Sequence, residues 1–151
     1  MRFTLLLLWA VLVAAGRPAL AQVTVTPVRD LAFGPVIVGV PTYIGPSHPV
    51  RSGQFRLTAP LSSRVQVRLT LPNRLNGPAG TTLPIGFANN DALHVGTGPN
   101  SVPVTFNPKA TRNIQMTESA ILVFIGGTVS PAGNQAQGSY TGTITLTINV
   151  Q

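Results

Sequence analysis

Cysteine is absent from this 151-residue chain, and only three of its side chains are acidic. Without cysteine the chain can form neither disulfides nor thiolate metal sites. Charged residues make up only 9% of the sequence, against about 25% in typical soluble domains. The sequence also contains no G-x-S-x-G, S-x-x-K or H-E-x-x-H motif. An enzyme is therefore the least favoured class, and we expect no catalytic residue, cofactor or bound metal.

The few titratable groups are scattered along the chain. Asp30, Asp91 and Glu118 are isolated in sequence, and His48 and His94 have no cysteine and few carboxylates to complete a metal shell. The local sequence around Asp30 and Asp91 is typical of turns. Catalysis would require the fold to bring all five side chains into one cluster.

The first 21 residues have the features of a secretory signal peptide. Arg2 is followed by the apolar run at residues 5–13, and Ala19-Leu20-Ala21 fits the small-x-small cleavage rule. The apolar run is shorter than the roughly 20 residues of a membrane-spanning helix. The sequence predicts one domain, residues 22–151, exported to the periplasm, the cell surface or the extracellular space, with no transmembrane anchor after cleavage.

The remaining sequence favours β-strands. Fifteen glycines and fourteen prolines disfavour long helices, and valine and threonine are abundant. Short alternating segments separated by turn residues predict an all-β antiparallel fold of about seven to nine strands. Strand patterns occur at residues 23–26, 31–34, 36–38, 54–59, 64–71, 83–88, 92–95, 102–106, 121–129 and 140–150. Residues 40–52, 72–82 and 130–138 are expected to be loops, and 107–120 is the one place for a helical turn.

The apolar face of each predicted strand defines a core. Gly126-Gly127, at a strand end, is typical of a bulge or a close backbone approach. The predicted buried residues are Phe33, Phe55, Leu57, Val65, Val67, Leu69, Phe87, Phe106, Val123, Ile125, Ile144, Leu146 and Ile148.

Residues 119–151 contain no Asp, Glu, Lys or Arg, although two of the strongest strand patterns lie there. Soluble monomers normally protect free strand edges with charged residues. These two strands must therefore be central in a sheet, covered, or paired with another chain.

The basic residues suggest a second surface. Arg56, Arg64 and Arg68 occupy outward strand positions, and Arg51 and Arg74 flank them. A face of this kind could contact an anionic envelope polymer or lipid headgroups, although simple solubilisation of the sheet faces is favoured. Nucleic acid is not expected, because no aromatic stacking platform accompanies the arginines.

Two segments resemble a known family. Residues 25–39, ending in Leu-Ala-Phe-Gly-Pro-Val-Ile-Val-Gly, resemble the opening strand of bacterial immunoglobulin-like domains. The closing segments 126–129 and 138–148 look like the domain of unknown function 4402, which is related to spore coat protein U domains and remotely to chaperone–usher pilus subunits. The resemblance implies an immunoglobulin-like β-sandwich used as a structural or fimbrial subunit, with like subunits or a periplasmic assembly chaperone as partners.

The resemblance also implies that the connection at residues 60–63 crosses between two sheets. The residues support the crossing independently, because a hairpin there would place Arg56 opposite Arg68.

In pilus subunits, a glycine and alternating apolar residues mark the strand beside a groove that an added strand fills. The matching residues here are Gly138, Tyr140, Ile144, Leu146, Ile148 and Val150. Val23 and Val25 have the alternation of the added strand, although residues 22–28 could equally begin the first strand in cis. We therefore expect an exported structural subunit of a bacterial surface or fimbrial assembly, for which β-strand addition is one route of assembly. The alternative is a monomeric carbohydrate- or envelope-binding module that uses its basic loops.

Overall fold

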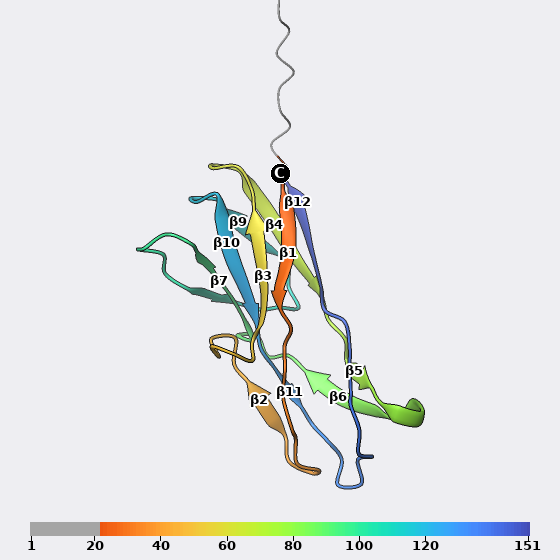
Figure 1. Cartoon of the computed structure of the whole chain (residues 1–151). Coiled ribbons are helices and arrows are strands. Elements are labelled where there is room, and N and C mark those ends of the chain that lie inside the picture. Colours follow the sequence, from red (N-terminus) through yellow and green to blue (C-terminus); the bar gives the residue numbers. More distant parts are fainter. Residues whose placement is uncertain (1–21) are drawn as a thin grey trace, which may run out of the picture.

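The computed structural model describes residues 22–151, and the predicted signal peptide, residues 1–21, lies outside the described residues. The described chain is all-β, with twelve strands and one short 3-10 turn, η1 (Pro78–Gly80) (Figure 1). The strands are β1 (Thr24–Arg29), β2 (Thr42–Ile44), β3 (Gly53–Thr58), β4 (Arg64–Thr70), β5 (Arg74–Asn76), β6 (Thr82–Gly86), β7 (Ala92–Gly96), β8 (Val104–Phe106), β9 (Arg112–Gln115), β10 (Ala120–Ile125), β11 (Gly127–Val129) and β12 (Thr145–Val150). None of these residues forms a helix with the length and hydropathy needed to cross a bilayer.

The strands form three antiparallel sheets. A five-stranded sheet has the order β1-β3-β10-β7-β8, a three-stranded sheet has the order β12-β4-β9, and a four-stranded sheet has the order β2-β11-β6-β5. The molecule is elongated, with β2, β5, β6 and β11 in the lower half of Figure 1. Gly126 separates β10 from β11, so the chain passes from the five-stranded to the four-stranded sheet at this residue.

The five-stranded and three-stranded sheets share one hydrophobic core. In β4, Val65, Val67 and Leu69 are buried while Arg64 and Arg68 are exposed, as a strand with one buried face requires. Eight of the thirteen predicted core residues are buried: Leu57, Val65, Val67, Leu69, Phe106, Val123, Ile125 and Leu146. The other five, Phe33, Phe55, Phe87, Ile144 and Ile148, are partly buried and pack against the buried clusters.

The connection between β3 and β4 crosses from one sheet to the other, which confirms the prediction for residues 60–63. Arg56 in β3 lies opposite Thr26 of β1 and Leu122 of β10. Arg68 in β4 lies opposite Thr147 of β12. The crossing therefore removes the repulsion that a hairpin would have created between the two guanidinium groups.

The helical turn expected within residues 107–120 is wrong for its central part, because Arg112–Gln115 forms strand β9. Ile114 and Met116 are buried and alternate with exposed Asn113 and Gln115. This short alternation gains its stability from pairing with β4, where Val65 lies opposite Ile114.

Several predicted boundaries were also wrong. Residues 31–34 and 36–38 form no strand, because the backbone turns at Gly34 and Gly39, which have positive φ angles of 70° and 74°. The expected loops 40–52 and 72–82 contain the three-residue strands β2 and β5. The last strand begins at Thr145, not at residue 140. Twelve strands therefore replace the expected seven to nine.

Candidate functional site

The two sheets leave an open seam between β1 and β12. β1 is the outermost strand of its sheet and pairs only with β3, and β12 is the outermost strand of its own sheet and pairs only with β4. The two strands lie side by side near the top of Figure 1 and diverge toward its lower half. Within residues 22–151 no ladder joins them, so each keeps one edge free of sheet hydrogen bonds.

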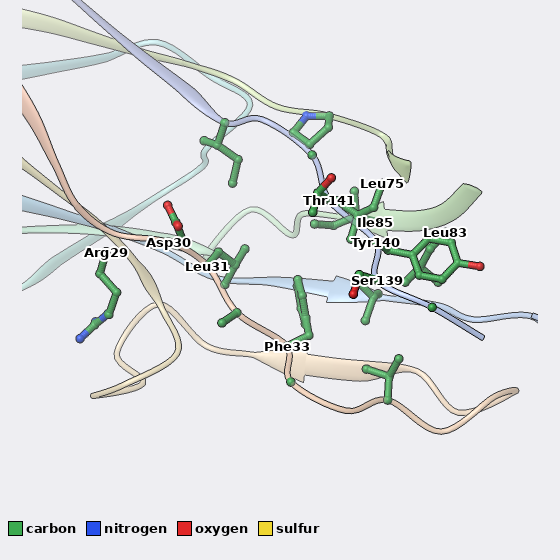
Figure 2. A pocket seen from close by; sticks show the side chains of 18 of the residues that line it. Arg29, Asp30, Leu31, Phe33, Leu75, Leu83, Ile85, Ser139, Tyr140 and Thr141 are labelled. Carbon is green, nitrogen blue, oxygen red and sulfur yellow. The ribbon is translucent and has the colours of Figure 1, made fainter. Parts of the chain in front are cut away.

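Below this seam lies a groove of about 550 Å³. Residues 27–36 form one wall and residues 138–144 form the other. Figure 2 shows Leu31 and Phe33 on the first wall and Tyr140 on the second. The floor is apolar and includes Phe55, Leu75, Leu83, Ile85 and Val129.

The second wall, residues 138–144, is hydrogen-bonded to β5 and to the loop that precedes the wall. The backbone N–H groups of Asn76 and Thr141 donate to each other's carbonyls at 2.7 and 2.9 Å. The Tyr140 hydroxyl donates to the Ala136 carbonyl at 2.7 Å and accepts from Nε2 of Gln135 at 2.7 Å. Gly138 has a positive φ of 146°. These hydrogen bonds hold the second wall against β5.

The first wall is held differently. The Ala32 N–H donates to the Arg51 carbonyl at 2.9 Å, and Nη1 of Arg51 donates to the Phe33 carbonyl at 3.2 Å. Gly34 lies against the Arg51 guanidinium, which a Cβ at that position would approach to 3.3 Å. These contacts connect the first wall to the loop at residues 45–52 and not to the second wall.

The structure places the predicted strand-exchange residues around this seam. Gly138, Tyr140 and Ile144 line the groove. Val23 and Val25 are partly buried against the main core, and β1 pairs with β3 of the same chain, so the N-terminal strand lies in cis. In β12, Leu146 is buried, Ile148 is partly buried, and Val150 is 57% exposed at the end of the strand.

The arginines predicted to contact an anionic surface do not share one face. Arg56 points outward from the five-stranded sheet, whereas Arg64 and Arg68 point outward from the three-stranded sheet on the other side of the core. Arg51 contacts the groove wall and Arg74 lies on β5. The fold therefore divides this positive charge over separate surfaces.

The titratable groups do not form one cluster either. Asp30 lines the groove, His48 lies in the loop at residues 45–52, and Asp91 is buried with its Oδ2 accepting the Ala88 N–H at 2.7 Å. Only His94 and Glu118 share a depression. Among residues 22–151, no group of three or more His, Asp or Glu side chains could hold a metal ion.

Two groups beside that depression have altered acidities. The Ser101 hydroxyl donates to Glu118 and lowers its pKa, with further help from the Gly98 N–H at 2.5 Å, against the opposing effect of partial burial. Burial and the nearby Arg112 charge lower the pKa of His94. Because Glu118 accepts hydrogen bonds from Gly98 and Ser101, it anchors the loop at residues 97–101.

Sequence reasoning missed much of the groove lining. Leu31, Leu75, Leu83, Ile85 and Val129 come from four separate segments, and each follows an ordinary apolar pattern. Only the uncharged sequence of residues 119–151 pointed to an unprotected edge near this site.

The comparisons with known proteins give one match. The model of the family described as Domain of unknown function (DUF4402) matches residues 23–150. No curated protein and no solved structure matches the chain.

Proposed function

This chain belongs to the DUF4402 family, and from that premise we propose that it is an exported, non-enzymatic structural subunit of a bacterial surface or fimbrial assembly. Its partners are further copies of the same chain, joined by exchange of β-strands. The exchanged segment is residues 22–29, here called the arm. One observation carries the proposal: the arm has a ladder on one side only, although its other side faces the free edge of β12.

The strand order supports an immunoglobulin-like sandwich. An immunoglobulin constant domain has sheets ABED and CFG. The order β1-β3-β10-β7 corresponds to A-B-E-D, and β4-β12 corresponds to C-F. The position of strand G, beside the free edge of β12, holds no strand of the described residues. The seam between β1 and β12 therefore corresponds to the vacant position of strand G.

The arm is suited to exchange because the contacts that it makes in cis can be made equally well in trans. It pairs with β3 from Thr24↔Thr58 to Arg29↔Gln54, and Val23 and Val25 pack against the core. Exchange of identical segments between copies is a low-cost route to assembly, because each chain recovers the same interactions. Residues 30–41 contain no strand and can serve as the hinge.

The neighbouring edge favours this use. β12 carries no charged residue, and no Lys or Pro protects its free edge. Full burial of one valine side chain contributes about 1.5–3 kcal/mol. Loss of the arm would therefore remove a substantial part of a free energy of unfolding of about 5–15 kcal/mol. An arm released by one copy can therefore pair with β3 of another copy, in the vacated place next to the free edge of β12.

The absence of cysteine gives a direct test. Thr26 and Arg56 are exposed and directly opposite each other in the ladder between β1 and β3, a geometry that suits a disulfide. The double variant Thr26→Cys, Arg56→Cys of the exported chain is concentrated and then oxidised. Exchange predicts a series of disulfide-linked oligomers, of two or more chains, on a non-reducing gel.

A matched control uses the pair Arg56→Cys, Leu122→Cys, because this pair lies between β3 and β10 and stays within one chain in either state. Deleting residues 22–28 should abolish assembly, and the truncated chain should bind a synthetic peptide of that sequence but not one with Val23→Asp and Val25→Asp. Only intrachain disulfides at all concentrations, together with no peptide binding, would overturn the proposal.

A further inference from the structure

The C-terminal end of the arm is clamped to a neighbouring loop by one side chain. Nε of Arg29 donates to the Ser52 carbonyl at 2.7 Å, and Nη2 donates to the Ser52 hydroxyl at 2.8 Å. Nη1 donates to the Pro49 carbonyl at 2.5 Å. The planar guanidinium thus holds two residues of the loop at once, with charge-assisted bonds that are stronger than neutral ones.

The loop at residues 45–52, here called the lock loop, is in turn organised by His48. Its Nδ1 accepts the backbone N–H groups of Val50 at 3.2 Å and Arg51 at 3.0 Å. The buried Ser52 hydroxyl donates to the His48 carbonyl at 2.7 Å. His48 therefore sets the positions of the atoms that Arg29 binds.

The hydrogen bonds to the His48 ring require a lone pair on Nδ1. A neutral imidazole has that lone pair, whereas in the imidazolium both ring nitrogens are donors. Protonation would direct an N–H bond at the N–H groups of Val50 and Arg51. It would also add positive charge to a loop that contains Arg51 and binds the guanidinium of Arg29. The acidic residue nearest to this loop in the sequence is Asp30, which follows Arg29.

The end of the arm and the segment that follows it are both hydrogen-bonded to the lock loop. Arg29 binds Pro49 and Ser52, and residues 32 and 33 bind the backbone and side chain of Arg51. A change in the lock loop thus loosens the arm at its hinge, while the ladder between β1 and β3 is left as the remaining hold.

We propose that His48 is a pH-operated lock on the arm, which retains the arm in cis when the ring is neutral and releases it for exchange when the ring is protonated. This inference rests on the proposed strand exchange and adds its regulation. Mild acidification is therefore expected to promote assembly, and neutral pH to preserve the monomer.

The test measures opening of the arm separately from assembly. Hydrogen exchange followed by mass spectrometry gives the protection factor of the peptide that covers Thr24–Arg29, at pH 7.5 and pH 5.5. Protection factors, corrected for intrinsic exchange, are compared at a concentration where the chain is monomeric. We expect protection of the arm to fall about tenfold at the lower pH, a change equivalent to the loss of one or two hydrogen bonds.

Two substitutions separate the lone pair from the side chain itself. His48→Asn keeps an acceptor for the two N–H groups without titrating near neutrality, so the arm should stay protected at both pH values. His48→Ala removes the acceptor, so protection should be low at both. His94 is present in all of these proteins, and its contribution to the pH dependence is therefore common to them.

The clamp has its own matched pair. Arg29→Gln removes the guanidinium fork and should lower arm protection about tenfold at pH 7.5, whereas Arg64→Gln removes the same charge from an exposed position in β4, a strand that does not pair with the arm, and should leave protection unchanged. If His48→Asn retains the full pH dependence of the parent, the lock is refuted. Concentration-dependent disulfide ladders that are insensitive to His48 would refute the lock alone. A pH-dependent arm in a chain that forms no interchain ladder would support the lock and refute exchange.

Discussion

Gly126→Ala should be one of the most damaging single-methyl additions in this protein. Gly126 is buried at the junction of β10 and β11, and its N–H donates to the Asp91 carbonyl at 2.7 Å. A Cβ at this position would lie 2.2 Å from the Ile44 carbonyl oxygen and 2.8 Å from backbone atoms of Gly45 and Pro46. All three atoms belong to the main chain, so a side-chain rotation cannot relieve the contact.

The size of the effect follows from this geometry. Overpacking in a folded core costs about 1–3 kcal/mol, and a clash with backbone places this variant near the upper end of that range. In a domain of this size, about 3 kcal/mol corresponds to a fall in Tm of about 10 °C. Movement of the junction would also weaken the hydrogen bond to Asp91.

The assay is thermal and urea unfolding followed by circular dichroism, with Gly86→Ala as the control. Gly86 lies in β6 and pairs with Thr128 in the same sheet, yet a Cβ there would meet nothing within 4 Å. The control should therefore melt within about 2 °C of the parent. The reasoning fails if Gly126→Ala also melts within 2 °C of the parent, or if the two variants lose the same stability.

Further predictions concern the core and two titratable groups. Leu146→Ala, on the buried face of β12, should cost about 2–5 kcal/mol in urea unfolding, and a loss below 1 kcal/mol would contradict the assigned face. Because Ser101 and Gly98 lower the pKa of Glu118, this carboxylate stabilises the fold above its ordinary value of 4.5, and the gain disappears as pH falls through the lowered value. Glu118→Gln should flatten the urea midpoint against pH in that acidic range, and an unchanged slope would argue against the anchor. The pKa of His94 is lowered from 6.5, so the folded state binds fewer protons than the unfolded state and stability falls below about pH 6.5. His94→Gln should reduce that fall, which the same titration measures.

Local alternation determined much of the fold from the sequence. In β4 the buried Val65 and Val67 alternate with the exposed Arg64 and Arg68, because successive side chains of a strand point to opposite faces. The crossing at residues 60–63 was predictable for a related reason, since like charges disfavour the alternative hairpin. Gly126 could be identified as a close-approach residue, because no other residue lacks a Cβ.

Pairing partners, in contrast, were decided by the tertiary structure. Residues 31–38 have the apolar pattern of strands, but the turns at Gly34 and Gly39 direct them along the groove without a ladder. Arg112–Gln115 becomes a strand because β4 offers it an edge. A short segment's own preference is weak, so the neighbour that supplies its hydrogen bonds decides its conformation.

The candidate site depends almost wholly on such long-range placement. The alternation of Val23 and Val25 and the uncharged end of the chain indicated that strand edges were available. The seam itself exists because β1 and β12 belong to different sheets whose outer edges meet without pairing. Arg29 and Ser52 are 23 residues apart, and no local sequence pattern predicts the hydrogen bonds between them. Side-chain periodicity is a local property that the sequence displays directly, whereas the meeting of two sheet edges is a property of the packed chain.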